Sequence, residues 1–459
     1  MNKDRHTKRE PRHVGRRRIG LVSVVLAAGL LAAACSSNSS SSTTTTGGGS
    51  SSNNGGATAP GVTATSITIG ATTPLTGPAA PGYSEIAAAS NAVFKWANAN
   101  GGVNGRQINY IIKDDGYNPV NTVTLTRQLV QQNNIFADVG SLGTPTQLAV
   151  EPFLNSNKVP QLFVESGCNC WSQSNSPWTF GWQTNYTVEG KILGQYIKQN
   201  FAGQKVGYLY QADEFGQDFI KGLDQELPST SVVSRQNYDA ATLAGPMSNQ
   251  IAALKAAGAQ VVALATVPAA TALALLPAAS IGYKPQWVAS NVGADPPTVG
   301  ALLKSFSQGA AGTTLLDGMV SDAYVPPEAN TSNPWIQAIQ NVLTKYDPGA
   351  PLDGNTEYGV ALGYTFIQAL QKAGPNLTRA GIVSAIESSG STFVSPGLVP
   401  FTYSNSVHFG YSGAQIATIN GGAATTTGPV YTSTINGPIK VFTGTTTPPP
   451  ASLLVLSST

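Results

Sequence analysis

Two cysteines one residue apart are the residues of this 459-residue chain whose types and spacing most directly suggest chemistry. Cys168 and Cys170 lie in the segment FVESGCNCW, and Cys35 is the third cysteine of the chain. A metal site would need further soft ligands, and no neighbouring lysine or histidine would lower a thiol pKa for redox catalysis. Outside the cytoplasm such a pair is oxidised in preference to free. We therefore predict a structural disulfide rather than a redox pair, and no metal.

Histidine is too scarce to support most hydrolytic or metal chemistry. His6 and His13 lie near the N-terminus, so His408, which is expected in a loop, is the only histidine in the rest of the chain. This disfavours a Ser/His/Asp triad and a His-rich metal site. No GxxxxGK[ST] segment is present, which excludes nucleotide hydrolysis by that route. The sequence predicts a protein that is not an enzyme and has no cofactor.

The N-terminus predicts export. Residues 1–18 contain eight Lys or Arg and two acidic residues, and residues 19–34 are apolar and small. This pattern favours a signal peptide over residues 1–34 rather than a single membrane helix. The segment LLAAAC resembles a bacterial lipobox, so Cys35 is predicted to carry a lipid that anchors the protein to the outer face of the cell membrane. The arginines at 16–18 leave twin-arginine export as an alternative to general secretion.

The remainder of the chain begins with a stretch rich in Ser, Thr and Gly, which predicts a flexible lipidated tether over residues 35–60. Without the first 34 residues, 17 of the 25 basic and 21 of the 23 acidic residues remain, a net charge of −4. The basic character belongs to the signal peptide, so nucleic acid is not an expected partner. The body of about 400 residues is long enough for two domains.

Short β-like runs alternate with helical stretches along this body. Strands are predicted at SITIGATT (66–73), QINYIIKDD (107–115), IFADVG (135–140), PQLFV, KVGYLY (205–210), SVVSRQNY, VVALA (261–265) and QWVAS. Helices of about ten to fifteen residues separate them, which is typical of doubly wound parallel sheets. The pattern restarts after PQLFV and therefore predicts two successive α/β lobes. Residues 318–443 are less regular and are expected to complete both lobes.

Ligands of open parallel sheets bind at the carboxyl ends of the strands. Here those ends are followed by TTPLTGPAAPGY, GSLGTPT, ESGCNCW, QADEFG and SNVGAD. In GSLGTPT, Thr144 is expected to cap a helix whose first residue is Pro145, leaving free backbone N–H groups at the cleft. Such an end could receive a carboxylate, and the alternative is an ordinary capped helix.

Four longer segments carry a family resemblance: ITIGATTPLTGPAA, NANGGVNGRQINYIIKDDGYNPVNTVTLTRQLV, GSLGTPTQLAVEPFLNSNKVPQLFV and YLYQADEFGQDFIKGL. In this order they resemble the Leu/Ile/Val-binding family of type I periplasmic substrate-binding proteins of ABC transporters. The resemblance implies two lobes joined by a three-strand hinge, with crossovers near Gln183, Asp322 and Gly397. We therefore expect lobe 1 at residues 61–184, completed by 319–396, and lobe 2 at residues 185–318, completed by 397–448.

The resemblance also implies where the ligand is held. Its contacts correspond to an aromatic residue in the first loop, to the segment after the third strand, to the following loop, and to two positions in the second lobe. The predicted ligand-binding residues are Tyr83, Gly143, Thr144, Thr146, Ser166, Gly167, Asn169, Phe215 and Asn291.

Two of these positions depart from the amino-acid-binding members of the family. Phe215 stands where those members have a tyrosine, and Asn291 stands where they have the glutamate that pairs with the ligand's ammonium group. A neutral amide loses most of that charge-assisted bond. We therefore expect a small carboxylate ligand, either an amino acid or an apolar or aromatic acid, and hypothesise that a carboxylate without the α-amino group binds at least as well. Three acidic residues nearby, Asp213, Glu214 and Asp295, could replace the missing glutamate.

The resemblance implies a solute-binding lipoprotein of an ABC importer, with the permease and its ATPase as partners. Two alternatives stay open at this point. One is a ligand-sensing module for a membrane receptor, and the other, less favoured, is a hydrolase on the same scaffold.

Overall fold

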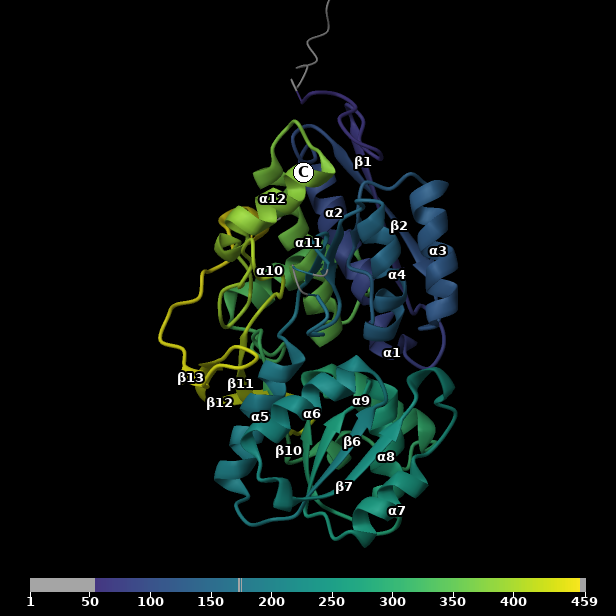
Figure 1. Cartoon of the computed structure of the whole chain (residues 1–459), viewed down its shortest axis with the longest axis vertical. Coiled ribbons are helices and arrows are strands. Elements are labelled where there is room, and N and C mark those ends of the chain that lie inside the picture. The colour runs from purple at the N-terminus through teal and green to yellow at the C-terminus, as the bar shows by residue number, and fades with distance from the viewer. Residues whose placement is uncertain (1–53, 172–173, 175, 455–459) are drawn as a thin grey trace, which may run out of the picture. The chain divides into compact units, whose positions relative to one another are not determined.

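The computed structural model describes residues 54–171, 174 and 176–454, which belong to one unit of the chain. The predicted signal peptide, Cys35 and most of the predicted tether lie outside the described residues. Within the described part, no helix is both long and apolar enough to cross a membrane. Figure 1 shows the helices and strands of this part.

The first sheet has five parallel strands in the order β2-β1-β3-β4-β5. In β1 every residue from Ile69 to Thr73 is buried, as expected for a strand of a parallel sheet that is covered on both faces. The elements of this part are β1 (Ser66–Thr73), α1 (Ala80–Tyr83), α2 (Ile86–Ala99), β2 (Gln107–Asp114), α3 (Pro119–Gln131), β3 (Asp138–Val139), α4 (Thr144–Ser156), β4 (Gln161–Val164) and β5 (Thr179–Gly181).

The second sheet has eight strands in the order β13-β12-β11-β10-β9-β8-β6-β7. Strands β6 to β10 are parallel, and β11 to β13 extend the sheet in antiparallel fashion. Its first elements are α5 (Tyr186–Asn200), β6 (Val206–Gln211), α6 (Glu214–Glu226), β7 (Val232–Tyr238), α7 (Ser248–Ala256), β8 (Val261–Ala265), α8 (Pro268–Ser280), β9 (Gln286–Ala289), α9 (Pro296–Phe306) and β10 (Met319–Ala323).

The last part of the chain contributes to both lobes. It contains α10 (Pro334–Tyr346), α11 (Gly354–Ala373), α12 (Arg379–Ser389), β11 (Gly413–Asn420), β12 (Ala423–Thr432), β13 (Lys440–Val441) and α13 (Ala451–Leu454). Helices α10 and α11 pack against α2 of the first lobe, and α12 packs against α11, whereas β11 to β13 join the second sheet. Five short 3₁₀ helices complete the described elements: η1 (Ser229–Ser231), η2 (Ala240–Thr242), η3 (Asn291–Gly293), η4 (Thr313–Leu316) and η5 (Gly390–Thr392).

The fold class predicted from the sequence, two α/β lobes built on parallel sheets, is confirmed. The chain passes between the lobes after β5, after β10 and before β11. One segment differs from the expected division. Residues 319–323, which were expected to begin the completion of lobe 1, form β10 inside the second sheet, because β10 pairs with β9 on one side and with β11 on the other.

Small residues allow α11 to pack closely against α2 in the first lobe. The Ser90 hydroxyl of α2 donates a hydrogen bond of 2.8 Å to the carbonyl oxygen of Gly359. A Cβ atom at Gly359 would lie only 2.3 Å from the carbonyl oxygen of Ile86, so this close approach requires glycine. A capping box of Asp353 and Thr356 starts α11. The N-terminal end of α11, which lines the space between the lobes, is therefore held firmly in place.

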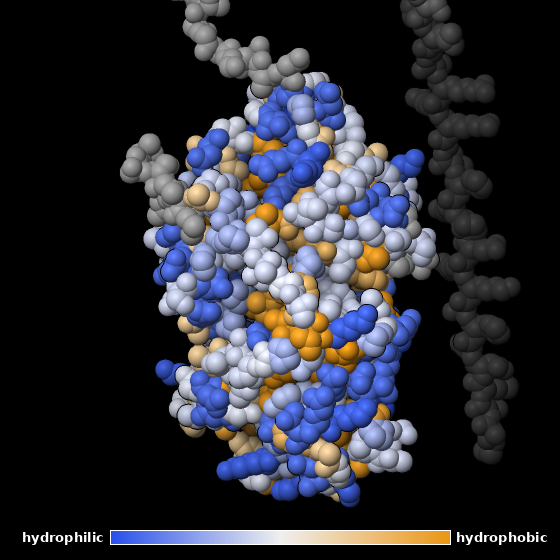
Figure 2. Space-filling model, turned by 90° about the vertical axis from the view of Figure 1, so that its left-hand side faces the viewer, coloured by the Kyte–Doolittle hydropathy of each residue, from blue (hydrophilic) through white to orange (hydrophobic). Residues whose placement is uncertain are grey.

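Aromatic residues fill the region where the chain crosses between the lobes. The Trp182 ring lies 4.5 Å from the Tyr358 ring and 5.3 Å from the Tyr411 ring, measured between centroids. His408 lies in a loop, as expected, but it is fully buried and stacks on Phe180 at 3.7 Å. Burial lowers the pKa of His408, which indicates a structural role. On the face in Figure 2, hydrophobic residues gather at the level where the two lobes meet in Figure 1.

Candidate ligand-binding cleft

A cleft between the lobes encloses about 1100 Å³, part of it open to solvent. Its walls come from α1, from the segments after β2, β3, β4, β5, β6, β8 and β9, from β10 and the residues after it, from the start of α11, and from β11 and β12. The segments that follow parallel strands thus meet at one place, as the strand-end rule predicts.

Five of the nine predicted ligand-binding residues line this cleft, and four do not. The five are Tyr83, Gly143, Thr144, Phe215 and Asn291. The other four, Thr146, Ser166, Gly167 and Asn169, are outside the lining and make hydrogen bonds or close contacts within the protein.

The first turn of α4 reaches the cleft, but its capping differs from the sequence prediction. Gly143, not Thr144, is the N-cap residue, and it adopts a φ of 108°, which favours glycine. The Thr144 hydroxyl instead shares a 2.8 Å hydrogen bond with the Ser166 hydroxyl, while the Thr146 hydroxyl donates to the Leu142 carbonyl at 2.5 Å. Because no side chain caps the helix, the positive end of its dipole is turned toward the cleft wall at Gly143 and Thr144.

The loop after β4 supports the cleft from behind. The Asn169 backbone N–H and Nδ2 donate hydrogen bonds of 2.7 and 2.6 Å to the Asp218 carboxylate of α6, and Asn185 donates to Asn169 Oδ1 at 2.6 Å. A Cβ atom at Gly167 would lie 2.2 Å from the carbonyl oxygen of Thr184. The contacts of Asn169 and Gly167 therefore fasten this loop to the second lobe. No local sequence pattern predicts these contacts.

The two cysteines of the same loop are joined. A disulfide links Cys168 and Cys170, whose Cα atoms are 5.1 Å apart. Cys168 is buried and packs with Trp171 and Val164. Neither cysteine lines the cleft. The bridge would stiffen the loop rather than form a wall of the site.

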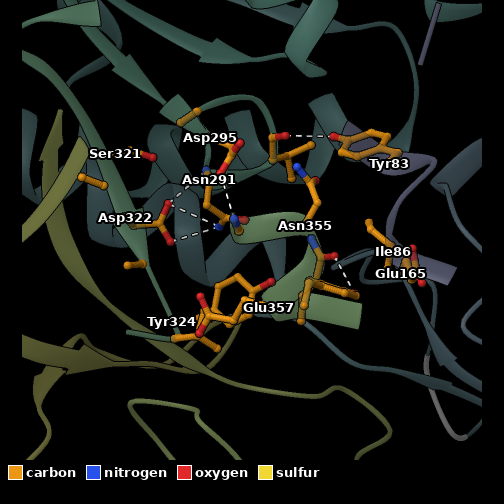
Figure 3. A pocket seen from close by; sticks show the side chains of 18 of the residues that line it. Tyr83, Ile86, Glu165, Asn291, Asp295, Ser321, Asp322, Tyr324, Asn355 and Glu357 are labelled. Carbon is orange, nitrogen blue, oxygen red and sulfur yellow. Dashed lines mark hydrogen bonds between the residues drawn. The ribbon is translucent and has the colours of Figure 1, made fainter. Parts of the chain in front are cut away.

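Asn291 lies between two carboxyl groups of the second lobe. Its Nδ2 donates a hydrogen bond to Asp322 Oδ2 at 3.2 Å (Figure 3). Its Nδ2 also donates to Glu189 Oε1 at 2.9 Å, and its backbone N–H donates to Glu189 Oε1 at 2.8 Å. Burial and the neighbouring Asp322 raise the pKa of Glu189 well above its usual value, and burial raises the pKa of Asp322 to about 6. A glutamate at position 291 would add a third carboxyl group to this pair, whereas the amide donates a hydrogen bond to each of the two.

Carboxyl groups that the sequence pattern did not identify line the same cleft. Together with Asp295 they are Glu165, Asp322, Glu328 and Glu357. No described residue of the lining is Lys, Arg or His. The other two acidic residues considered from the sequence are absent from the lining: Asp213 caps α6 and Glu214 is exposed. Glu165 directly follows β4, so the strand-end rule could have found it, but Glu328 and Glu357 come from distant segments.

Burial acts on the acidity of all these groups. It raises the pKa of Glu328 to about 7 and the pKa values of Glu165 and Glu357 well above their usual range. For Glu357, the nearby carboxyl groups of Glu328 and Asp295 raise the pKa further. A positive charge that entered the cleft would stabilise the ionised form of these carboxyl groups, and a hydrogen-bond acceptor would stabilise their protonated form.

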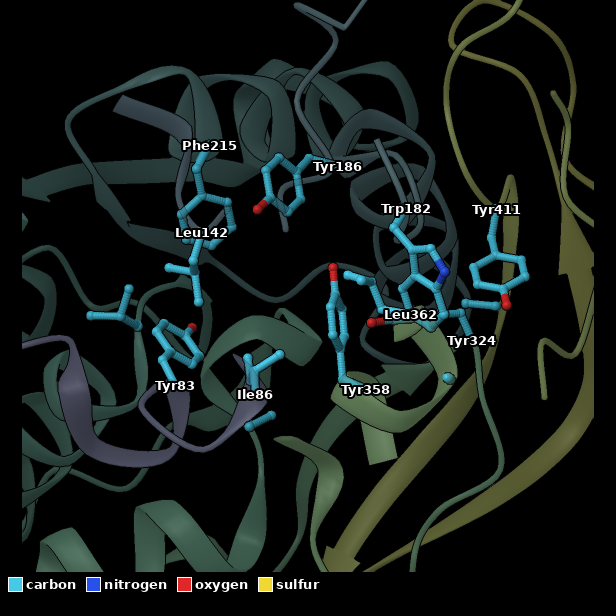
Figure 4. Packing of buried hydrophobic residues seen from close by; sticks show 14 of the residues in the cluster. Tyr83, Ile86, Leu142, Trp182, Tyr186, Phe215, Tyr324, Tyr358, Leu362 and Tyr411 are labelled. Atoms are coloured by element: carbon cyan, nitrogen blue, oxygen red, sulfur yellow. The ribbon is translucent and has the colours of Figure 1, made fainter. Parts of the chain in front are cut away.

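Aromatic rings form much of the remaining wall. Tyr83, Tyr186, Phe215, Tyr324 and Tyr358 all line the cleft, and Figure 4 shows them on different segments around it. The Tyr186 and Phe215 rings are 4.6 Å apart, and Tyr358 packs on the hinge aromatics described above. The site thus combines ring faces with carboxyl groups and one helix N-terminus.

Besides the bonds of Asn169, four hydrogen bonds among the described residues join the two lobes across the cleft. The Tyr83 hydroxyl donates to the Val292 carbonyl at 2.8 Å (Figure 3), and Gly354 N–H donates to Asp295 Oδ1 at 3.0 Å. The other two run from Asn355 Nδ2 to Thr298 Oγ1 at 3.0 Å and from Gln211 Nε2 to the Tyr117 hydroxyl at 3.2 Å. The two lobes are therefore closed on each other.

Comparisons with known proteins agree with this geometry. A family model described as "Periplasmic binding protein" matches residues 66–424, and the chain belongs to that family. Leu/Ile/Val-binding protein homolog 2 of Brucella abortus (strain 2308) is 23% identical over 359 residues, which cover 73% of this chain and 90% of that protein. The predicted resemblance is thereby confirmed. The family implies an extracytoplasmic location, and its named relatives are binding proteins rather than enzymes.

Two solved structures are similar in fold. The fatty acid ABC transporter substrate-binding protein from Thermomonospora curvata is 24% identical, with a TM-score of 0.71 over 83% of this chain and 96% of that chain. A branched chain amino acid ABC transporter from Thermus thermophilus with bound valine is 20% identical, with a TM-score of 0.69 over 81% of this chain and 97% of that chain.

Proposed function

We propose that this protein is an extracytoplasmic solute-binding lipoprotein that captures a small carboxylate-bearing ligand between its lobes and delivers it to an ABC importer. The observation that carries the proposal is the uncapped first turn of α4 at the wall of a closed inter-lobe cleft. A helix N-terminus favours a bound carboxylate. One of the two solved structures named above is of a fatty acid-transporter binding protein and the other contains bound valine, and both fatty acids and valine carry a carboxylate.

A thermal-shift screen of amino acids and small carboxylates tests the ligand class. A ligand at about a hundred times its Kd adds about 2.7 kcal/mol of stability. In a body of about 400 residues this corresponds to an increase in Tm of about 3 °C. Binding by no carboxylate in the screen would count against the ligand class, even if other solutes bound.

The transport role and the anchor need separate measurements. A strain without the protein should lose uptake of the ligand found in the screen, together with strains without the permease or its ATPase. Retained uptake with loss of a response to the ligand would instead favour a sensing module. Substituting Cys35→Ala should release the protein from the membrane fraction, and unchanged retention would refute lipidation at Cys35.

A further inference from the structure

Three carboxyl groups gather where the lobes meet, and they come from three separate segments. Asp295 follows η3 in the second lobe, Glu328 lies in the crossing after β10, and Glu357 lies in the first turns of α11. All three line the cleft. They are close enough to influence one another, since Glu357 lies in the electrostatic field of both Glu328 and Asp295. Closing the lobes brings three carboxyl groups together, which disfavours their ionisation.

Glu357 carries an oxygen that the closed protein leaves without a partner. The residue is 1% exposed, and its Oε1 has no hydrogen-bond partner among the described residues. By contrast, Asp295 accepts hydrogen bonds from Gly354 N–H and from Thr298. A buried carboxyl oxygen without a hydrogen-bond partner destabilises the folded protein. Its presence at the wall of a binding cleft indicates a group completed by a ligand.

Aromatic rings stand beside this carboxyl group. Tyr324 lies in the electrostatic field of Glu357, and both residues line the cleft. Tyr83 approaches from the opposite wall (Figure 3). Carboxyl groups combined with ring faces are the surroundings in which proteins hold organic cations. The lining offers no basic side chain that could neutralise the carboxyl groups instead.

We propose that the ligand carries a positively charged nitrogen, which binds among Asp295, Glu328 and Glu357 beside the Tyr324 ring. This inference rests on the proposed function and narrows its ligand class. Carboxyl groups of α11 and of the segment after β10 thus take the place of the glutamate that Asn291 replaces. The nitrogen would offset the repulsion that closure creates, so that ligand binding and closure favour each other. The deaminated acid favoured by the sequence would lack this contribution.

Calorimetry with matched ligands and the purified full-length protein tests the proposal. One set is leucine, 3-methylbutylamine and 4-methylpentanoate, and the second is phenylalanine, 2-phenylethylamine and 3-phenylpropanoate. These sets separate an ammonium group that belongs to an amino acid from one that belongs to a simple amine. In at least one set, a ligand with the nitrogen is expected to bind at least tenfold more tightly than the acid without it.

The variant Glu357→Gln assigns the effect to the site. It should weaken the nitrogen-bearing ligand at least tenfold and should not weaken the matching acid. Glu151→Gln, on α4 and outside the cleft lining, is the control and should change neither. The Tm of the ligand-free variant checks that it folds. Because glutamine replaces an unpaired buried carboxyl group, this Tm should equal or exceed that of the unchanged protein.

Two results would overturn the proposal in different ways. If the acid binds as tightly as the nitrogen-bearing ligand and Glu357→Gln has no effect, the cation site is wrong while the proposed capture of a carboxylate stands. If none of the six compounds binds, the cation site and the carboxylate ligand class both fall. Tight binding of the amine alone would support the cation site and count against the carboxylate ligand class.

Discussion

Replacing Glu328 with glutamine is expected to reduce the pH dependence of the stability of the ligand-free protein. Burial, with Asp295 and Asp353 nearby, raises the pKa of Glu328 from 4.5 to about 7. Between these values the folded protein holds a proton that the unfolded chain has released. The stability from Glu328 is therefore fully present below about pH 4.5 and is lost as the pH rises through 7. Glutamine cannot release a proton, so the variant should keep this stability at pH 8.

The size of the effect follows from the same pKa. A pKa difference of one corresponds to about 1.36 kcal/mol, so the rise of the Glu328 pKa from 4.5 to about 7 amounts to about 3.4 kcal/mol at most. Glu328 is only partly buried, and solvent screening reduces the value to about 2 kcal/mol. The unfolding entropy of about 400 residues converts this into about 2–3 °C. Asp322 and Glu357, whose pKa values are also raised, act in the same direction.

Differential scanning calorimetry from pH 5 to pH 8 measures this effect. The Tm of the unchanged protein should fall across this range, and the Tm of Glu328→Gln should fall by about 2–3 °C less. Glu151→Gln, remote from the cleft, should follow the unchanged protein. Parallel profiles for Glu328→Gln and the unchanged protein would refute the reasoning, because they would mean that Glu328 titrates alike in the folded and unfolded states.

Three further outcomes are expected. Tyr83→Phe removes the hydrogen bond across the cleft and should weaken ligand binding by about 1 kcal/mol, or about fivefold in Kd by calorimetry; an unchanged Kd would mean that this bond does not favour closure. Gly190→Ala should lower the free energy of unfolding by about 2–3 kcal/mol in denaturant titrations, because its Cβ would lie 2.1 Å from a backbone oxygen of α6, whereas Gly245→Ala, with open space around it, should change little. Alkylation without reductant followed by intact-mass measurement should label neither Cys168 nor Cys170, and two added labels would mean that no bridge forms.

Local sequence patterns predicted most strands of the two lobes. The predicted strands at 66–73 and 261–265 coincide with β1 and β8, because both are apolar runs bounded by turn residues. The hairpin of β11 and β12 was missed, since its strands are rich in Thr, Ala and Gly, although the turn at Gly421–Gly422 marks it. Helix α10 was missed too, although Asn333 followed by Pro334 is a helix-start signal.

The sequence predicted only those residues of the site that directly follow a strand or match a motif of the family. Thr144 and Phe215 follow strands, and the strand-end rule brings them to the cleft. Glu328 and Glu357 reach it because the chain crosses between the lobes and returns, which no local pattern reveals. Asn291 was predicted to contact the ligand through a neutral amide in place of the family's glutamate. Its pairing with the carboxyl groups of Glu189 and Asp322 became visible only in the fold.

The close packing of α11 on α2 also constrains how the molecule assembles. The two helices are separated by more than 250 positions of the chain, and Ser90 bonds to a carbonyl 269 residues later. Contacts of such long range close large loops and slow folding. During synthesis, the first lobe cannot bury the α2 face until α11 has left the ribosome, and the second lobe then still lacks β11 to β13. A chain that ends before residue 354 would lack part of both cores, so neither lobe is expected to fold as an independent N-terminal fragment.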